Sequence, residues 1–255
     1  MSRPVAIVTG ASRGIGKRLA LDLAQADFDV VCVARTSAAN PSKLPGTVEE
    51  TADGVRSLGR RAMPVGLDVR DEAAVMKLVE RIFDEWGRCD LLINNAAVAP
   101  PRPALEDSTK RWRLAFEVNV NGPFYFMYYL CPRMAQAGGG RVVNVSSSAA
   151  IFHQFGRASY TATKRGLEGM SQALGHDLRG RVAVNCLRID LPIWSEGFEF
   201  TLGADAQIDY EDPVVVTDAV LWLIAQRISH TSEIHTLTEL RELGLVRPRT
   251  LHDRS

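Results

Sequence analysis

Two side chains suited to proton transfer lie four residues apart in "SYTATKRG", the segment that contains Tyr160 and Lys164. In a helix, this spacing places both side chains on one face. An ammonium group near a phenol favours the phenolate, and a phenol tuned in this way can exchange a proton with a substrate oxygen. Two ordinary surface residues of a helix give the same pattern, so both readings stay open at this point.

A group of hydroxyl side chains precedes this pair. The apolar segment "VNVSSS" ends in serines, and Ser147 lies thirteen residues before Tyr160. If the segment is a buried strand, its last hydroxyls lie at the edge of the sheet, where one of them can hydrogen-bond a substrate carbonyl. A serine cluster that only caps the next turn is the alternative.

A glycine-rich turn, "TGASRGIG" (9–16), follows the first apolar run and precedes a helical pattern. Glycine permits unusual dihedral angles and lets the backbone approach a pyrophosphate that is held by the N–H groups of a helix. Tight packing of the helix on the sheet is the alternative reading. The candidate cofactor-binding residues in this turn are Gly10, Ser12, Arg13, Gly14, Ile15 and Gly16.

Arg35 in "ARTS" ends the second apolar run, where an acidic residue would bind the ribose hydroxyls of NAD. A guanidinium can clamp a 2′-phosphate through two hydrogen bonds, whereas a carboxylate would repel it. The sequence therefore favours NADP(H) over NAD(H). Arg13 can add a second positive charge beside the same phosphate, although each arginine alone is also consistent with a solvated loop residue.

Two further candidate cofactor contacts end the third and fourth apolar runs. Asp68 in "LDV" can accept a hydrogen bond from the adenine amino group, and Val69 lies next to it. Asn95 in "NNAA" can fix the neighbouring backbone. Helix capping and turn formation are the alternatives for these polar residues.

Short, continuous apolar runs alternate with helical patterns, such as those at 14–26 and 71–87, along most of the chain. Continuous runs are typical of parallel strands that are covered on both faces. We therefore expect a single Rossmann-type α/β domain over residues 1–255, a doubly wound parallel sheet of about seven strands with helices on both faces. The runs that predict strands are 5–9, 29–34, 62–69, 90–95, 141–146 and 182–187.

The long segment 188–213 interrupts this alternation and is expected to form a lid over the substrate. It contains Trp194, Phe198 and Phe200, which suit a lipophilic carbonyl or alcohol, although packing of the loop on the body explains them equally well. His153 and Gln154 are candidates for the opposite wall of the pocket.

The composition narrows the function classes. Thirty basic and thirty acidic residues cancel and are scattered, which argues against binding to nucleic acid or to anionic lipid. The four cysteines are far apart and lack a C-x-x-C motif, so we expect reduced thiols and no metal site. The sequence shows neither a membrane-spanning apolar run nor a signal pattern, and a cytoplasmic protein is expected.

The motifs together resemble the short-chain dehydrogenase/reductase family over roughly residues 3–237. "TGASRGIG", "NNAA", Asn119 in "VNVNG", Ser147 and "YTATK" occur in the family's order and spacing. The resemblance implies that Tyr160 is the general acid/base and that Lys164 binds the nicotinamide ribose and tunes Tyr160. It also implies that Ser147 polarises the substrate oxygen and that Asn119 holds a proton-relay water.

The aromatic segment "FYFMYYL" (124–130) belongs to a helix that forms subunit interfaces in similar proteins, so the resemblance implies a homodimer or homotetramer. Ala97 replaces the family's usual glycine, and Ile189 and Asp190 replace a Pro-Gly pair that normally contacts the nicotinamide carboxamide. The tail "EIHTLTELRELG" lacks the usual glycine-rich ending. Together with the long stretch 42–59, these departures resemble the hydroxysteroid-dehydrogenase-like branch.

We therefore expect an NADP(H)-dependent oxidoreductase that interconverts a carbonyl and an alcohol on a lipophilic small molecule. The main alternative is a catalytically silent NADP(H)-binding sensor or scaffold, but damage to the four catalytic residues would mark such a protein, and all four are present. A nucleotide-sugar epimerase or dehydratase normally needs an added substrate domain, for which 255 residues leave little room.

Overall fold

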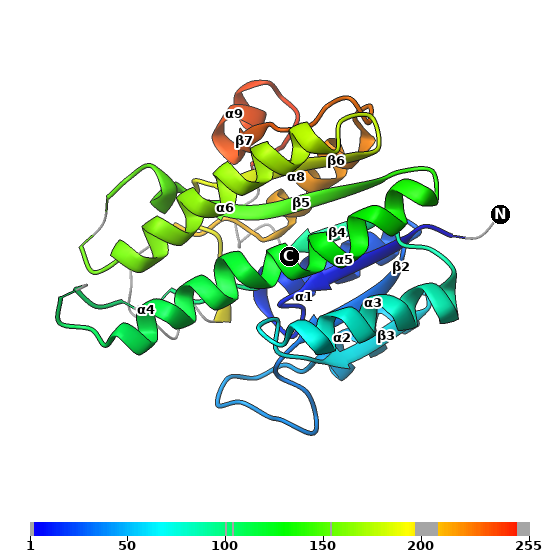
Figure 1. Ribbon diagram of the computed structural model, residues 1–255, viewed down its shortest axis with the longest axis horizontal. Coiled ribbons are helices and arrows are strands. Elements are labelled where there is room, and N and C mark those ends of the chain that lie inside the picture. Colours follow the sequence, from blue (N-terminus) through cyan, green and yellow to red (C-terminus); the bar gives the residue numbers. More distant parts are fainter. Residues whose placement is uncertain (1–2, 100, 104, 154, 197–208, 249–255) are drawn as a thin grey trace.

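The strands form one parallel sheet. The structure, a computed structural model, describes residues 3–99, 101–103, 105–153, 155–196 and 209–248. The described residues contain seven strands in the order β3-β2-β1-β4-β5-β6-β7, with every neighbouring pair parallel (Figure 1). The predicted doubly wound sheet is therefore confirmed. The strands are β1 (Val5–Thr9), β2 (Asp29–Ala34), β3 (Ala62–Gly66), β4 (Leu91–Asn94), β5 (Gly140–Ser147), β6 (Val182–Ile189) and β7 (Ile234–Thr236).

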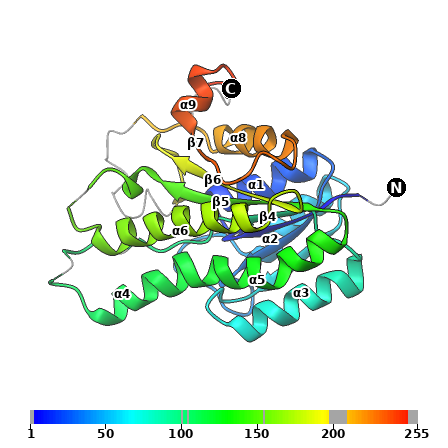
Figure 2. The same ribbon diagram turned by 45° about the horizontal axis from the view of Figure 1, so that its top comes forward.

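Helices cover both faces of this sheet, and Figure 2 shows α1 and α8 on the opposite side from α3 and α5. Alternate residues of one strand enter different hydrophobic clusters, so that Ala6 packs toward α1 and α8 while Ile7 packs toward α3 and α5. This double burial explains why the strands are continuously apolar. The helices are α1 (Gly14–Gln25), α2 (Val48–Ser57), α3 (Glu72–Trp86), α4 (Thr109–Phe116), α5 (Gly122–Gln136), α6 (Ala158–Asp177), α8 (Val214–Ala225) and α9 (Leu237–Glu242).

The third strand is shorter than its apolar run predicts. It ends at Gly66, whereas the apolar run continues to residue 69. Beyond it, Asp68 forms a turn in which its carboxylate accepts hydrogen bonds from the backbone N–H and the guanidinium of Arg70. A local side-chain to backbone bond of this kind competes with strand pairing.

Helices α4 and α5 are joined by a π-helical turn, Glu117–Asn121, that contains Asn119. Such single turns widen a helix locally and occur frequently at functional sites. Within the described residues, no helix is long and apolar enough to cross a membrane.

Candidate active site

The glycine turn between β1 and α1 is built from backbone that leaves no room for side chains. A Cβ atom on Gly16 would lie 2.2 Å from the carbonyl oxygen of Gly10 and 2.6 Å from Nδ2 of Asn95. Gly10 and Gly14 have positive φ angles of 70° and 54°, which L side chains rarely adopt. Shape and backbone conformation therefore both require glycine in this turn, and Gly16 packs α1 tightly against the residue that follows β1.

Thr9 ties this turn to the end of β4. Its hydroxyl accepts hydrogen bonds from the backbone N–H groups of Asn95 and Ala96, at 3.0 and 3.1 Å. The Asn95 amide donates in turn to the carbonyl oxygen of Thr9, at 2.9 Å. Asn95 thus fixes the backbone of the glycine turn in the described structure.

Arg35 lies exposed at the end of β2, and its guanidinium makes no hydrogen bond or ion pair with any residue in the described ranges. Nearby, Asp68 forms an ion pair with Arg70 at 2.7 Å. The hydrogen bond from Arg70 lowers the pKa of Asp68, and the charge of Arg35 contributes to the same shift. Because Arg70 neutralises Asp68, the positive charge of Arg35 remains available to an anion.

Arg13 has a different setting from the one its sequence position suggests. Its guanidinium donates to Ser42 Oγ at 2.7 Å and to the carbonyl oxygens of Pro45, Leu44 and Gly46 at 2.8 to 3.2 Å. It therefore anchors the loop between β2 and α2 against the glycine turn, and these bonds occupy the side chain expected to face a phosphate.

The predicted proton-transfer pair lies at the N-terminal end of α6. Lys164 is 3% exposed, and its Nζ donates a hydrogen bond of 2.6 Å to the carbonyl oxygen of Val145 in β5. The same Nζ lies 5.6 Å from the ring centroid of Tyr160. The two side chains therefore share one helix face against the carboxyl end of β5, as their spacing predicts.

Ser147 is the last residue of β5 and also begins the next turn. Its Oγ accepts a hydrogen bond of 3.2 Å from the backbone N–H of Ala149 in the 3-10 turn Ser148–Ala150. The capping role that the sequence left open is therefore present. Because a hydroxyl is both donor and acceptor, the cap leaves its O–H free to donate to a ligand oxygen.

Asn119 is buried, and its side-chain amide binds two separate segments. Oδ1 accepts from Val98 N and Nδ2 donates to Val98 O, both at 2.8 Å, while Nδ2 also donates to Thr163 Oγ1 at 3.0 Å. The π-helical turn thus holds the segment after β4 against α6. These bonds commit the Asn119 amide to protein partners.

Two buried polar networks connect the helix of Tyr160 and Lys164 to the sheet, and the sequence did not predict them. In the first, Glu168 accepts hydrogen bonds from Arg188 Nε and Nη2, both at 2.8 Å, and from Ser146 Oγ at 2.7 Å. In the second, Asn144 joins Asn94 to Ser171 through two bonds of 2.8 Å. Both connect α6 to β5, the strand that ends in Ser147, and to one of its neighbours, β6 in the first network and β4 in the second. Their partners are far apart in the chain, and no local motif marks them.

The segment after β6 crosses the glycine turn. A Cβ on Gly14 would lie 3.0 Å from Ser195 Cβ and 3.5 Å from Glu196 Oε2. Ser195 and Glu196 of the predicted lid therefore border the candidate nucleotide site. Trp194 is partly buried in this segment, and His153 is exposed. Phe198, Phe200 and Gln154 lie outside the described residues.

The unusual Asp190 and the unusual tail contact each other. Oδ1 of Asp190 accepts a hydrogen bond of 3.1 Å from the backbone N–H of Thr238 in α9. Helix α9 itself begins with a capping box formed by Thr236 and Glu239. The replacement of Pro-Gly thus supplies an acceptor that attaches the C-terminal helix to the end of β6.

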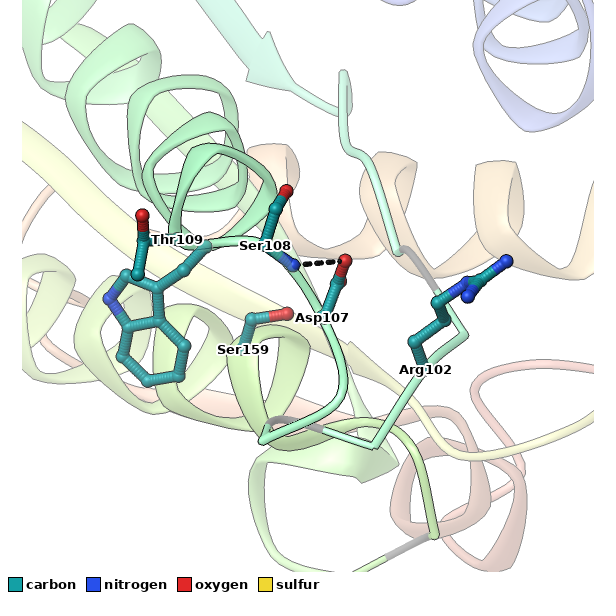
Figure 3. A pocket seen from close by; sticks show the side chains of 6 residues that line it. Arg102, Asp107, Ser108, Thr109 and Ser159 are labelled. Atoms are coloured by element: carbon teal, nitrogen blue, oxygen red, sulfur yellow. Dashed lines mark hydrogen bonds between the residues drawn. The ribbon is translucent and has the colours of Figure 1, made fainter.

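A small polar pocket of about 110 Å³ opens between α4 and α6, next to Tyr160. Figure 3 shows Asp107, Ser108 and Ser159 grouped together, with the Arg102 side chain extending away from them. The pocket is lined by Arg102, Asp107, Ser108, Thr109, Trp112 and Ser159. Ser159 directly precedes Tyr160 in α6, but consecutive helix residues point in different directions, and Tyr160 is not among the residues that line the pocket.

Nothing in the described part of the chain forms a cluster of three or more His, Cys, Asp or Glu side chains that could hold a metal. All four cysteines are free and buried. Burial raises the pKa of Cys32, Cys131 and Cys186 to about 12, and it also raises that of Cys89. These thiols stay protonated and unreactive at neutral pH.

Comparison with known proteins defines the class. The chain matches the family model of the short chain dehydrogenases over residues 4–189, and it therefore belongs to that family. Hydroxysteroid dehydrogenase-like protein 2 of Xenopus laevis is 29% identical over 221 residues, which cover 86% of this chain and 53% of the relative. The chain thus spans about half the length of the curated relatives it matches. The predicted family and its hydroxysteroid-dehydrogenase-like branch are confirmed.

Two solved structures carry different cofactors. A metagenomic short-chain oxidoreductase in complex with NADP is 26% identical, with a TM-score of 0.76 over 91% of this chain and 96% of the other. A short chain dehydrogenase from Mycobacterium paratuberculosis bound to NAD is 24% identical, with a TM-score of 0.79 over 92% of this chain and 96% of the other. The fold is therefore shared with proteins that bind either nucleotide.

Proposed function

We propose that this protein is an NADP(H)-dependent oxidoreductase that interconverts a carbonyl and an alcohol on a lipophilic small molecule. The observation that carries the proposal is the setting of Lys164, a buried cation held by Val145 O beside Tyr160. A buried ammonium is costly unless it serves a partner. In this position the ammonium lies 5.6 Å from the ring of Tyr160, the side chain proposed as the general acid/base.

The residues present fit a dinucleotide. The glycine turn leads into the N-terminus of α1, which has no side-chain cap and whose N–H groups suit a pyrophosphate, and the exposed Arg35 suits a 2′-phosphate. When bound, the cofactor supplies or accepts the hydride. The candidate contacts of the proposal include Asp68, Val69 and Asn95, while Arg13 would act through the loop that it anchors.

The four catalytic residues have separate roles in this proposal. Tyr160 transfers the proton to or from the substrate oxygen, and Ser147 donates a hydrogen bond to the same oxygen. Lys164 holds the ribose beside Tyr160. Asn119 positions the segment after β4 against α6, because its amide is bound to Val98 and Thr163. Any water relay through Asn119 would therefore use its backbone.

The lipophilic substrate class is supported by apolar side chains around the candidate site. Phe152 and Phe155, which are 62% and 91% exposed, lie between Ser147 and Tyr160 in the chain. Trp112, in the pocket beside Ser159, adds an aromatic surface. Exposed apolar side chains gathered near one site are typical of a surface that meets an apolar ligand or a partner.

The proposal includes a homodimer or homotetramer that acts in the cytoplasm. Helix α5 presents Phe124 and Tyr128, 38% and 59% exposed, as an uncovered aromatic surface. Their rings lie 5.8 Å apart. Association through this face would bury aromatic area of the kind that stabilises subunit interfaces.

The substitution Tyr160→Phe tests the function. It removes the proton-transfer oxygen and should lower turnover about a thousandfold, while NADPH binding, followed by fluorescence titration, stays unchanged. A panel of aliphatic, terpenoid, steroid and aromatic carbonyls with NADPH, and of the alcohols with NADP, would supply the substrate for this assay.

The variant Tyr125→Phe is the matched control, because it removes a hydroxyl from α5 outside the proposed catalytic group. Its turnover should equal that of the unchanged protein. Full activity of Tyr160→Phe would remove the assigned acid/base role, and turnover of no substrate in the panel would count against the lipophilic class.

A further inference from the structure

Helix α6 carries three functional side chains at successive four-residue intervals, namely Tyr160, Lys164 and Glu168. They follow one face of the helix along β5. A lysine and a glutamate at this spacing are neighbours on a helix surface and readily form an ion pair. Glu168 is therefore the natural competitor of Tyr160 for the ammonium of Lys164.

In the described structure, Glu168 is bound to other groups. Arg188 of β6 donates from Nε to Oε1 and from Nη2 to Oε2, both at 2.8 Å, and Ser146 of β5 donates to Oε1 at 2.7 Å. Lys164 instead donates to Val145 O. The side chains of Glu168 and Arg188 are only 8% and 15% exposed, so this two-point pair excludes most solvent.

The register of the sheet accounts for this arrangement. Ser146 of β5 pairs with Arg188 of β6, so both donors reach Glu168 from adjacent strands beneath α6. The planar guanidinium matches both carboxylate oxygens, which a lysine at this position would not do. The carboxylate is thereby held by the sheet while Lys164, one turn earlier, is left to bind elsewhere.

We propose that Arg188 is a positioning residue that holds Glu168 away from Lys164 and so keeps the ammonium available to Tyr160 and to the cofactor ribose. The assignment of Tyr160 as the acid/base rests on the proposed function. The geometric part of the proposal, that Arg188 decides which partner Lys164 has, does not depend on turnover.

The charged and titratable groups around Glu168 come from α6, from β6 and from the residue that follows β6. Lys164 lies on α6, and Arg188, Cys186 and Asp190 lie on β6 or directly after it. The hydrogen bond to Glu168 raises the pKa of Arg188, and burial raises that of Cys186 to about 12. Arg188 therefore stays charged and Cys186 stays neutral, so neither changes state while a phenol titrates.

The test uses Arg188→Met, alone and combined with Glu168→Gln. The ionisation of Tyr160 is followed by ultraviolet difference titration, in which the spectrum of each background with Tyr160→Phe is subtracted. In Arg188→Met, Glu168 is free to capture Lys164, and the Tyr160 midpoint should rise by about one pH unit, a tenfold effect. In the double variant, glutamine cannot neutralise Lys164, and the midpoint should return to its original value.

The double variant separates this proposal from a merely structural role. If the pair only braces α6 against the sheet, removing both partners will disturb Tyr160 at least as much as removing one. An unchanged midpoint in Arg188→Met, or the same shift in both variants, would overturn the proposal. Arg188→Gln removes the positive charge and the two-point match to Glu168, so that the ammonium of Lys164 becomes the stronger partner of Glu168, and it serves if Arg188→Met does not fold. The Tyr160 midpoint should rise in this variant as well, and an unchanged midpoint would overturn the proposal.

Arg61→Met is the matched control. Arg61 binds the buried Asp29 at 2.7 Å, but this pair lies at the opposite edge of the sheet. The control should lower stability and leave the Tyr160 midpoint unchanged, and an equal shift in it would overturn the proposal. If the unchanged protein turns over no carbonyl substrate while the midpoints behave as expected, only the proposed function fails.

Discussion

The candidate nucleotide site and the candidate catalytic site are built in opposite ways. At the nucleotide site (residues 9–16, Arg35, Asp68 and Asn95), the glycine turn has positions where a side chain does not fit, and Arg35 is exposed. At the catalytic site (Asn119, Ser147, Tyr160 and Lys164), Asn119 and Lys164 are buried and form hydrogen bonds to neighbouring elements, while Ser147 and Tyr160 are partly exposed. The nucleotide site therefore depends on the absence of side chains at its glycines, whereas the catalytic site depends on the presence of particular polar side chains.

This difference teaches which changes each site tolerates. A substitution that adds an atom should damage the nucleotide site most, because the backbone atoms of the glycine turn are already closely packed against one another. Removing an atom should damage the catalytic site most, because each buried polar group there would lose a partner. The difference between the two sites can therefore be tested with substitutions that add an atom to the nucleotide site and substitutions that remove a polar group near the catalytic site, each with a matched control.

The largest effect is expected for Gly16→Ala. Its methyl group would overlap Gly10 O, so the turn must shift at a cost of about 3 kcal/mol of folding free energy, and NADPH binding should be lost. Denaturant unfolding and fluorescence titration measure the two effects. Gly169→Ala adds the same atom on α6 where nothing lies within 4 Å, and it should be neutral or slightly stabilising. If Gly16→Ala changed neither the folding free energy nor NADPH binding, the nucleotide site would not depend on the absence of a side chain at this position.

The converse change at the catalytic site is Asn144→Ala. It leaves the buried amide of Asn94 without its partner, removes one of the hydrogen bonds of Ser171 and should cost about 2 kcal/mol. Turnover should fall with it, whereas the affinity for NADPH should not. Asn40→Ala, in an exposed loop, is the control for loss of stability. A fall in NADPH affinity as large as the fall in turnover would show that the two sites are not separate.

A smaller effect is expected for Arg35→Ala at the nucleotide site. Loss of an exposed guanidinium should weaken NADPH binding about tenfold, equivalent to about 1.4 kcal/mol, without changing stability. NADH, which lacks the 2′-phosphate, provides the internal control in the same titration. An equal loss for both nucleotides would show that Arg35 does not read the phosphate and would remove the basis for NADP(H) preference.

The sequence predicts best what is encoded locally. The glycine turn and the Tyr160-Lys164 pair are short motifs whose spacing fixes their geometry, and the structure places both at the carboxyl edge of the sheet. The apolar run 62–69 also identifies β3, but Asp68 diverts its end into a turn with Arg70. A local hydrogen bond shortened the strand without altering its hydrophobic pattern.

The sequence does not reveal what depends on strand register. Ser146, Glu168 and Arg188 meet only because β5 pairs with β6 in one register and α6 packs above them. The same holds for Arg13, whose role as an anchor depends on a loop about thirty residues away. Residue type alone suggested a phosphate ligand there, but carbonyl oxygens of the chain reach the guanidinium.

The smallest expected effect lies at the β7 edge of the sheet. The Nε2 atoms of His230 and His235 lie 2.9 Å apart, and the rings stack with centroids 5.0 Å apart. Burial, followed by the charge of His235, lowers the pKa of His230. The unfolded chain therefore binds a proton more readily, so stability is fully present above about pH 6.5 and is lost as pH falls below that value.

Because His230 is partly exposed, solvent screening should limit this loss to a few tenths of a kcal/mol. Urea unfolding at about pH 7.5 and 5.5 would measure it, with His230→Asn removing the dependence and the exposed His153→Asn retaining it. Since β7 pairs with β6 at Arg188, a parallel fall in turnover would mean that the edge strand helps to hold the catalytic site. Unchanged turnover would show that the elements supporting the catalytic site are only β4, β5, β6 and α6, which are joined by buried side-chain hydrogen bonds.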